Sequence, residues 1–360
     1  MSDSKSGIKV RLKELSLAQI ESFMQNMGLQ KFRARQVFKW LYQKRVGSFD
    51  EMTNMSKDVR TMLHDNCSIG KLSPHYILES NIGDAVKFGF ALDNSSHIIE
   101  SVLLIDDKRR TACLSSQVGC GLGCSFCETG KLGFIRNLSQ EEIIGQLIGI
   151  DDYLCSRGDK LVTNIVFMGM GEALSNFDRF RSSLDIIMSE DGFNIGARRI
   201  TVSTAGVVPS IERLMKEDLT IGLAISLNAW NNELRDSYMP INRKYPIEEL
   251  VEIAKRYFHK TGRRVTFEYV VIESVTDTLE AARALQTLLG SFPCKVNLIP
   301  LNSAGNINVR SPDDSVVDRF AVELHRRGLA ATVRRSRGQD IMGACGQLTA
   351  SALKEKCNSV

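Results

Sequence analysis

Cys120, Cys124 and Cys127 are spaced so that three thiolates can converge on one inorganic group. Thiolate sulfur is the soft donor that iron-sulfur clusters and zinc both prefer, and a structural site normally closes with four ligands. Three thiolates can hold an iron-sulfur cluster while one iron stays open to another ligand. The spacing therefore predicts a catalytic iron-sulfur cluster, and the glycines between the cysteines leave the backbone free to wrap around it.

Zinc is the main alternative for this group. Cys113, seven residues before Cys120, could supply a fourth sulfur and close a site of four thiolates. Against this reading, the sequence offers no second C-x2-C pair and no nearby histidine ligands. The function from another class that this alternative implies is a zinc-containing RNA-binding module, in which the remaining fold is only a scaffold.

The elements that must position the cysteines follow an alternating pattern. Apolar strands are predicted at 111–115, 164–168, 199–203, 221–226, 265–271, 295–299 and 331–334. Helical stretches lie between them, and two are marked by the Ser139/Glu142 capping box and by a start at 311–312 that runs to Gly328. Such alternation predicts an α/β fold with a parallel sheet and right-handed crossovers, closing as a partial or full barrel.

Small polar residues follow several of these strands. The cysteine loop follows the first strand, and Gly171 and Glu172 follow the second. Ser203 ends the third, Ser226 and Asn228 follow the fourth, and Asn302 comes after 299–301. Reactive residues of parallel α/β folds gather at the carboxyl ends of strands, so these side chains should meet. Together with the cysteines they predict one bound polar cofactor.

The N-terminal part reads as a small helical domain. A capping box from Ser16 to Gln19 opens one helix, a second carries Val37, Trp40 and Leu41 on one face, and a third spans 56–64. Strands at 86–92 and 98–104, joined by a turn at 93–96, predict a hairpin. The expected domains are a helical accessory domain at 1–75, a β-hairpin linker at 76–105, a core at 106–350 and a flexible tail at 351–360.

Composition bounds the class of protein. The chain has 360 residues, 43% hydrophobic and 24% charged, with a formal net charge of +4, which is typical of a globular protein without a membrane span. No apolar stretch of signal-peptide length opens the chain, so we expect a cytoplasmic location. Nine cysteines in a reducing compartment favour ligands and redox groups over a disulfide framework.

Two basic stretches point to a polyanionic partner. Six cations and no acidic residue lie between positions 31 and 49, on a predicted helix. Arg334, Arg335 and Arg337 form a second stretch near the C-terminus. A solvated helix face is the alternative for the first stretch, but two such patches favour phosphate binding.

Longer strings of the chain resemble one known family. The cysteine loop and the glycine-glutamate loop are similar to those of the radical-SAM superfamily. The following strings resemble the RlmN family of bacterial adenine-C2 RNA methyltransferases: CLSSQVGC at 113–120, FCETGKLGF at 126–134, RNL at 136–138, MGMGEA at 168–173, VRRSRG at 333–338 and ACGQL at 344–348. FRARQ at 32–36 and MTN at 52–54 match that family's N-terminal RNA-binding segment.

The resemblance implies a partial (β/α)6 radical-SAM barrel with a small N-terminal all-α accessory domain. Cys120, Cys124 and Cys127 would hold one 4Fe-4S cluster, and two molecules of S-adenosylmethionine would be used per turnover. The positions that match the family's cofactor contacts are Gly171, Glu172, Ser203, Ser226, Leu227, Asn228 and Asn302.

The same resemblance implies roles for two further cysteines and one carboxylate. Cys345 would carry a methyl group, lose a hydrogen atom to a 5'-deoxyadenosyl radical and form a covalent adduct with RNA. Cys113 would resolve this adduct and leave a disulfide. Glu100 matches the family's proton acceptor, and a carboxylate at a strand end is the plainer reading. Cys67, Cys155, Cys294 and Cys357 are expected to be buried structural cysteines.

The implied partners are 23S rRNA, tRNA, a low-potential electron donor such as flavodoxin and a disulfide reductant, with the enzyme acting as a monomer. Ala173 stands where the RlmN pattern has proline, and the related Cfr enzymes, which methylate carbon 8 of adenine in 23S rRNA and confer antibiotic resistance, have alanine there. Met342 and Gly343 also depart from the family's usual Asp-Ala. A carbon-8 methyltransferase is therefore the alternative within the family.

Overall fold

The computed structural model describes residues 9–92, 97–302 and 309–349, which form two compact units. The first unit combines residues up to Ser73 with Ser139–Leu161 and Asp178–Gly196, and the second contains the remaining residues from Pro74 onward. The turn predicted at 93–96, the tail at 351–360 and Cys357 lie outside the described residues. Each unit is considered by itself.

The first unit is mainly helical. Its helices are α1 (Leu17–Asn26), α2 (Phe32–Tyr42), α3 (Lys57–Asn66), α5 (Gln140–Ser156) and most of α6 (Phe177–Met188), with short 3-10 turns at Leu12–Glu14 and Phe49–Glu51. Strands β1 (Val10–Arg11) and β2 (Cys67–Ser68) pair in parallel. The capping boxes predicted at Ser16 and Ser139 are both formed, so the predicted helix starts are confirmed.

The basic helix of this unit has acidic partners from distant parts of the sequence. Lys31 contacts Glu21 at 2.9 Å, and the exposed Lys39 contacts Asp191 at 3.2 Å. The buried residues of α2 include Val37 and Leu41, as its apolar spacing predicted. The local sequence therefore overstates the unpaired positive charge of α2, because the fold supplies carboxylates that the surrounding sequence lacks.

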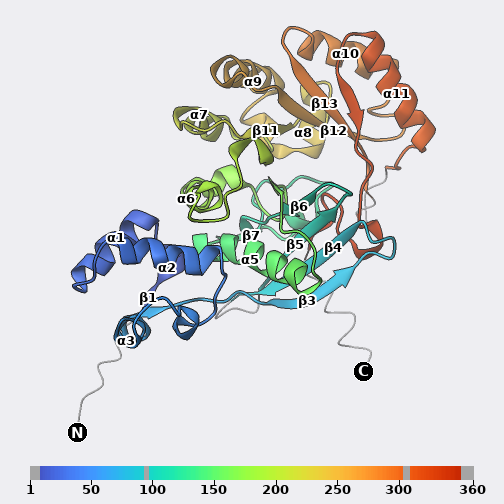
Figure 1. Ribbon diagram of the computed structural model, residues 1–360. Helices are drawn as coiled ribbons and strands as arrows, with labels where there is room; N and C mark the ends of the chain where they lie inside the picture. The colour runs from blue at the N-terminus through green and yellow to red at the C-terminus, as the bar shows by residue number, and fades with distance from the viewer. Residues whose placement is uncertain (1–8, 93–96, 303–308, 350–360) are drawn as a thin grey trace. The chain divides into compact units, whose positions relative to one another are not determined.

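The second unit is built on one ten-stranded sheet (Figure 1). Seven strands are parallel, from β6 at the centre to β14 at the edge, and β3, β4 and β5 continue the sheet beyond β6 in antiparallel order. The strand bounds are β3 (Pro74–Glu79), β4 (Ala85–Ala91), β5 (Ile98–Ile105), β6 (Arg110–Cys113), β9 (Asn164–Phe167), β10 (Ile200–Thr204), β11 (Gly222–Ser226), β12 (Val265–Val271), β13 (Cys294–Pro300) and β14 (Ala331–Val333).

Helices connect the parallel strands, and all of them except the short α8 (Asn232–Tyr238) lie outside the sheet in Figure 1. They are α7 (Val208–Lys216), α8 (Asn232–Tyr238), α9 (Ile247–Thr261), α10 (Leu279–Leu289) and α11 (Asp314–Arg326), with 3-10 turns at Ala173–Asn176, Ala197–Arg199, Pro240–Arg243 and Gln339–Ile341. A separate ribbon of β7 (Gln117–Gly119) and β8 (Phe134–Asn137) encloses α4 (Glu128–Lys131). The predicted α/β class, with its partial barrel and helical N-terminal region, is confirmed.

Successive side chains of a strand point to opposite faces of the sheet, so residues that pack in the core alternate with residues that face the site. On β12, Phe267 and Tyr269 are fully buried, whereas Glu268 and Val270 line a cavity on the other face. The predicted hairpin exists as β4 and β5, but the sequence reading missed β3. The domain boundaries stay a prediction. No helix in the described part of the chain is long and apolar enough to cross a membrane.

Candidate functional site

The cysteine loop runs from β7 to α4. Gly119 has φ +71°, and a side chain there would collide with the carbonyl of Gly133, which accepts a 2.8 Å hydrogen bond from the Cys120 backbone. Cys127 caps α4, and its backbone N–H donates to the Cys124 carbonyl at 3.1 Å. The local turns therefore fold the three cysteines into one compact loop.

The donor set of this loop suits a metal cluster. Burial raises the pKa of the Cys120 thiol to about 11 and also raises the pKa of Cys124 and Cys127, and neighbouring thiols of the same loop add to the first two shifts. Thiolates with such neighbours form readily only when cations compensate their charge. Among the described residues no group of three or more His, Cys, Asp or Glu side chains is arranged to hold a single metal ion.

One cavity, here called the strand-end cavity, lies at the carboxyl ends of the parallel strands. It brings together all three loop cysteines and most of the predicted cofactor contacts. The predicted residues that line it are Cys120, Cys124, Cys127, Gly171, Glu172, Ser203, Ser226, Asn228, Asn302 and Cys345. Residues from four strand ends and two loops thus converge as the sequence predicted, and Leu227 is the predicted cofactor contact that does not line the cavity.

Glu172 is a buried carboxylate that faces this cavity. Its Oε2 accepts a 2.9 Å hydrogen bond from the Ala205 backbone, while Oε1 is buried without a hydrogen-bond partner among the described residues. Burial raises its pKa to about 7, although the Ala205 bond opposes that shift. An unsatisfied buried carboxylate oxygen of this kind is suited to a cationic amine.

A side chain that the sequence reading missed fixes the loop before Glu172. Gln117 accepts the Glu172 backbone N–H at 2.8 Å and donates to Asn137 at 2.8 Å. Gly171 has φ +92°, and a Cβ there would lie 2.5 Å from the Cβ of Gln117. The glycine is therefore required by both its backbone conformation and this close approach.

The segment that carries Cys345 is tied to several elements of the unit. The Cys345 carbonyl accepts a 3.0 Å bond from Asn302, and the Gly346 carbonyl accepts a 2.7 Å bond from the Glu128 backbone. Thr129 donates its hydroxyl to the Leu348 carbonyl at 2.6 Å. These bonds place the Cys345 segment directly against the helix that ends the cysteine loop.

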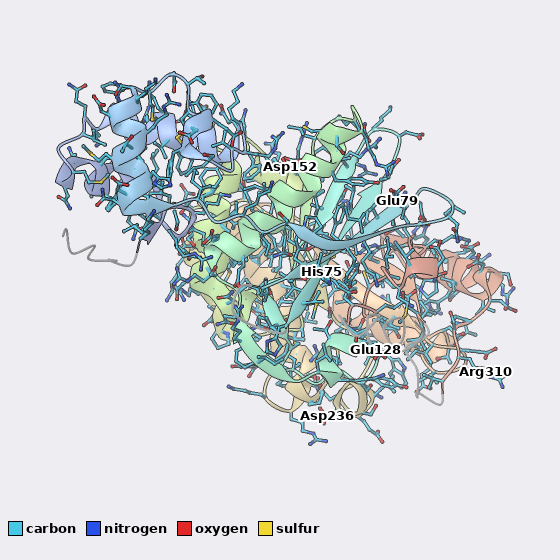
Figure 2. All side chains as sticks on the ribbon, turned by 90° about the horizontal axis from the view of Figure 1, so that it is seen from below. His75, Glu79, Glu128, Asp152, Asp236 and Arg310 are labelled. Atoms are coloured by element: carbon cyan, nitrogen blue, oxygen red, sulfur yellow. The ribbon has the colours of Figure 1, made fainter. Side chains whose placement is uncertain are left out.

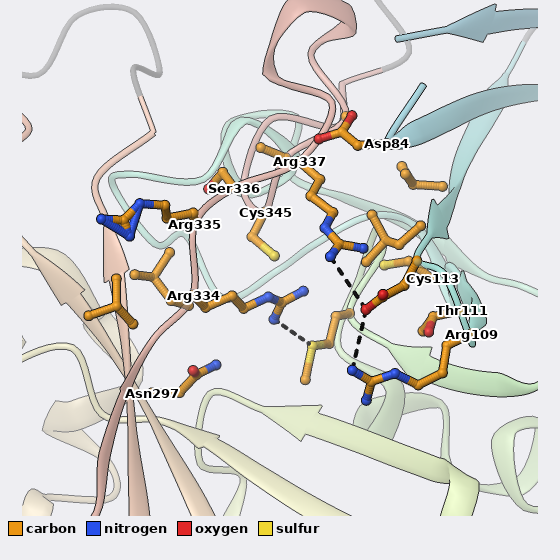
Figure 3. A pocket seen from close by; sticks show the side chains of 18 of the residues that line it. Asp84, Arg109, Thr111, Cys113, Asn297, Arg334, Arg335, Ser336, Arg337 and Cys345 are labelled. Carbon is orange, nitrogen blue, oxygen red and sulfur yellow. Dashed lines mark hydrogen bonds and ion pairs between the residues drawn. The ribbon is translucent and has the colours of Figure 1, made fainter. Parts of the chain in front are cut away.

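A second and larger space, here called the arginine cavity, has a volume of about 900 Å³. Figure 3 shows its arginines and its two cysteines, Cys113 and Cys345. Asp106 lies between two of the arginines, 3.4 Å from Arg109 and 3.5 Å from Arg337. Cys345 lines both cavities, whereas Cys113 lines only the arginine cavity, away from the three loop cysteines.

Arg334 also lines both cavities, and the sequence reading gave it no individual role. Its guanidinium lies 3.6 Å from the sulfur of Met168 and reaches toward Cys345 in Figure 3. The pKa of Arg334 is raised, first by the charge of Cys345 and also by those of Glu268 and Cys113, against the effect of burial. Burial raises the pKa of Cys113 to about 12, and the Arg334 charge counteracts this. One signal was available, since Arg334 ends the last predicted strand.

Glu100 lies in neither cavity. It is fully buried on β5, where Lys87 contacts it at 3.1 Å and the Tyr76 hydroxyl donates to it at 2.6 Å. Its Oε2 accepts the Thr349 backbone N–H at 2.8 Å. The structure therefore places Glu100 against the end of the Cys345 segment, with its charge already partnered.

Two family models match the chain. Residues 10–69 match the ribosomal RNA large subunit methyltransferase N-terminal domain, and residues 114–285 match the radical SAM superfamily. A solved radical SAM methyltransferase from Sphaerobacter thermophilus is 42% identical, with a TM-score of 0.90 over 95% of this chain and 100% of that one. The second match spans the cysteine loop and most of the strand ends that line the strand-end cavity.

Full-length relatives are similar over nearly the whole chain. The dual-specificity RNA methyltransferase RlmN of Geobacter sulfurreducens is 44% identical over 94% of this chain and 92% of its own length. The probable dual-specificity RNA methyltransferase RlmN of Staphylococcus haemolyticus is 43% identical over 95% and 93%. With this similarity, and with the cysteine loop at the strand ends, the chain belongs to the RlmN family within the radical SAM superfamily.

Proposed function

We propose that this chain methylates carbon 2 of an adenine in 23S ribosomal RNA and of an adenine beside the tRNA anticodon. The observation that carries the proposal is the position of Cys345, which lines both the strand-end cavity and the arginine cavity. A thiol at this junction can receive a methyl group from one side and present it to a nucleotide on the other. The names of the relatives, dual-specificity RNA methyltransferases, support an RNA substrate.

The residues of the strand-end cavity fit the cofactors that this function needs. Cys120, Cys124 and Cys127 would hold a 4Fe-4S cluster, and the unsatisfied Oε1 of Glu172 would accept the amine of S-adenosylmethionine. When bound, these groups supply methyl transfer to a thiol and homolytic hydrogen abstraction. Burial raises the pKa of Cys124 and of Glu172, so both groups ionise more readily when a cationic group binds beside them, which supports this assignment.

Cys345 and Cys113 would act in sequence. The methyl carbon on the Cys345 sulfur would give up one hydrogen atom by the homolytic abstraction named above and then bond to carbon 2 of adenine. One electron would leave this adduct for an acceptor such as the cluster, and protein and RNA would be linked through the carbon. The Cys113 thiolate would then attack the Cys345 sulfur, so that a sulfur-sulfur bond forms while the sulfur-carbon bond breaks. The electron pair of that bond would stay with the carbon, which takes up a proton and becomes the methyl group. The product is a Cys113–Cys345 disulfide, which a thiol reductant must reduce before the next turnover. Both cysteines line the arginine cavity, which supports this pairing.

Glu100 would accept the proton that leaves carbon 2. Its carboxylate is held beside Lys87 and binds the Thr349 backbone, four residues after Cys345. A proton acceptor at this place needs a relay, because Glu100 does not line the arginine cavity. Its bond to Thr349 also gives it a structural role in anchoring the Cys345 segment.

RNA would enter through the arginine cavity. Arg109, Arg334, Arg335 and Arg337 give this space a positive lining suited to phosphates, and about 900 Å³ is ample for a nucleotide turned out of its stack. In the first unit, Arg35 and Lys39 contact Asp191 but expose more than half of their side chains, and they would bind further phosphates of the RNA. The family match of residues 10–69 to an rRNA methyltransferase N-terminal domain supports this role.

The experiment is methylation by anaerobically reconstituted protein, followed by nucleoside mass spectrometry. We expect a brown protein with about four irons per chain and 2-methyladenosine in both a 23S rRNA fragment and tRNA. Finding 8-methyladenosine would instead establish the carbon-8 alternative. Colourless, zinc-containing protein that binds RNA without modifying it would overturn the proposal in favour of a binding module.

A further inference from the structure

Arg235 is a fully buried arginine on α8, next to the wall of the strand-end cavity. Three of its hydrogen bonds go to backbone carbonyls at the ends of β10 and β11, and the fourth goes to the side chain of Asn242. The acceptors are the carbonyls of Ala205 at 2.6 Å, Ser226 at 3.0 Å and Leu227 at 3.0 Å, and Oδ1 of Asn242 at 3.0 Å.

These acceptors are all neutral. Within the described residues no carboxylate forms an ion pair with Arg235. The next residue, Asp236, acts on Arg235 only through space and accepts a 2.7 Å bond from Asn242. Burial lowers the pKa of Arg235 to about 10, an unusual cost for a guanidinium. A fully buried guanidinium whose hydrogen bonds all go to neutral acceptors is unfavourable, so a further negative group is expected close to it.

The cysteine loop is the segment that packs against α8. The Ser125 backbone N–H, between two of the loop cysteines, donates to the Tyr238 carbonyl at 2.9 Å. The rings of Phe126 and Tyr238 lie 6.4 Å apart. Figure 2 shows the two segments in the same region, marked by Glu128 after the loop and Asp236 on α8. The Arg235 guanidinium itself donates to the Ala205 and Ser226 carbonyls, and these two residues line the same cavity as Cys124.

We infer that Arg235 is a positioning residue that provides the counter-charge for the cysteine loop and thereby raises the reduction potential of its cluster. The inference rests on the proposed function in one respect, that the three cysteines hold a 4Fe-4S cluster. Three thiolates outweigh the positive charge of the oxidised cluster core, and reduction makes the site more negative. A fixed buried cation therefore stabilises the reduced form more than the oxidised form.

The Arg235 side chain also helps to hold the shape of the strand-end cavity. Its hydrogen bonds fix the carbonyls of Ala205 and Ser226, both of which line the strand-end cavity. In addition, the Met239 backbone donates to the Arg235 carbonyl at 2.7 Å, and Met239 lines the same cavity. Removal of the side chain would therefore disturb packing as well as charge, and an experiment must separate the two effects.

The test compares Arg235→Gln, which removes the charge but keeps an amide donor, with Arg235→Lys, which keeps the charge but loses the guanidinium geometry. The midpoint potential of the reconstituted cluster is measured by redox titration with electron paramagnetic resonance, without S-adenosylmethionine or RNA. We expect a more negative potential for Arg235→Gln and a potential near that of the unmodified protein for Arg235→Lys. The melting temperature should fall in both variants.

A second variant covers the case in which Arg235→Gln does not fold. Asn242→Asp keeps all of Arg235 and places a carboxylate where its Nη1 now donates. Partial neutralisation of Arg235 should again make the potential more negative. Equal potentials in the folded variants and the unmodified protein, or equal shifts in Arg235→Gln and Arg235→Lys, would overturn the inference. Failure of the unmodified protein to assemble any cluster would instead overturn the proposed function.

Discussion

The side-chain amide of Asn302 donates a 3.0 Å hydrogen bond to the backbone carbonyl of Cys345. Asn302 follows β13 closely, so this bond ties the C-terminal segment to the end of a sheet strand. The Asn302 carbonyl accepts a 3.1 Å bond from Gln339, at the other end of the same segment. Asn302 thus positions the thiol that lines both cavities.

Replacement of Asn302 by alanine should loosen the Cys345 segment and lower RNA methylation at least about tenfold, because small displacements of a reacting group are costly. Initial rates with reconstituted protein measure this. Gln339→Ala is the matched control, since it removes a bond to Asn302 but leaves the bond to Cys345. A larger loss for Gln339→Ala than for Asn302→Ala would contradict this account of the contact.

The two thiols of the arginine cavity should give different phenotypes. Cys345→Ala should abolish both product and covalent adduct, because no sulfur remains to carry the methyl carbon. Cys113→Ala should form the adduct but resolve it poorly, so that RNA stays attached to Cys345 in denaturing gels and in peptide mass spectra. Cys155 is exposed on the first unit, so the prediction that it is buried was wrong, and Cys155→Ala should behave as unmodified protein. Resolved product at a normal rate from Cys113→Ala would exclude its proposed role.

The buried carboxylate of Glu172 should make the stability of the unloaded protein depend on pH. Its pKa rises from 4.5 to about 7 on folding, so the folded protein binds the proton more tightly and loses stability as pH rises through that window. Glu172→Gln cannot ionise and escapes this loss. At pH 8 the variant should be more stable by up to about 3 kcal/mol, and the difference should be much smaller at pH 4. Urea denaturation at the two pH values measures this, and a pH-independent difference would contradict it.

The same group should control cofactor affinity in the opposite direction. Protonation below about pH 7 removes the charge that would attract the amine of S-adenosylmethionine. Binding to the unmodified protein should therefore weaken as pH falls from 8 to 6, while binding to Glu172→Gln should be weak and nearly flat. Calorimetry under anaerobic conditions compares the two profiles, and parallel profiles would show that another group is responsible.

Gly171 should be intolerant of even a methyl group. Alanine there would have to adopt φ +92° and would place its Cβ 2.5 Å from Gln117, so we expect a loss of about 2–4 kcal/mol in unfolding free energy. Gly28 has φ +76° and open space around it, so it is the matched control for the cost of the backbone conformation without a steric clash. Gly28→Ala should cost about 1 kcal/mol. Equal losses in the two variants would show that the contact with Gln117 is not limiting.

Local patterns predicted the strands and the strand-end residues well. Apolar runs bounded by polar residues marked all seven parallel strands, and β12 was predicted with its observed bounds, Val265–Val271. The carboxyl ends of parallel strands meet by geometry, so Glu172 and Asn228 could be assigned to one site from their position in the sequence.

Long-range partners could not be predicted in this way. Arg235 looks like a solvated helix residue in the sequence, and only the fold shows that it is fully buried against the ends of two strands. Glu100 meets Lys87 through strand pairing and Thr349 through the return of the C-terminal segment, 249 residues later. Such contacts depend on tertiary packing, which leaves no periodic signal in the chain.

Cys113 ends β6, the strand at which the antiparallel and parallel halves of the sheet meet. It is paired with Val102 on one side and with Val166 on the other. The backbone of Cys113 is thus fixed by strand pairing on both sides. Cys345, in contrast, lies on a segment outside any strand and is held by hydrogen bonds. In the proposed mechanism, the movement that joins the two sulfurs would come from the segment that bears Cys345. A substitution that makes this segment more rigid should therefore slow turnover even where every reactive group is intact.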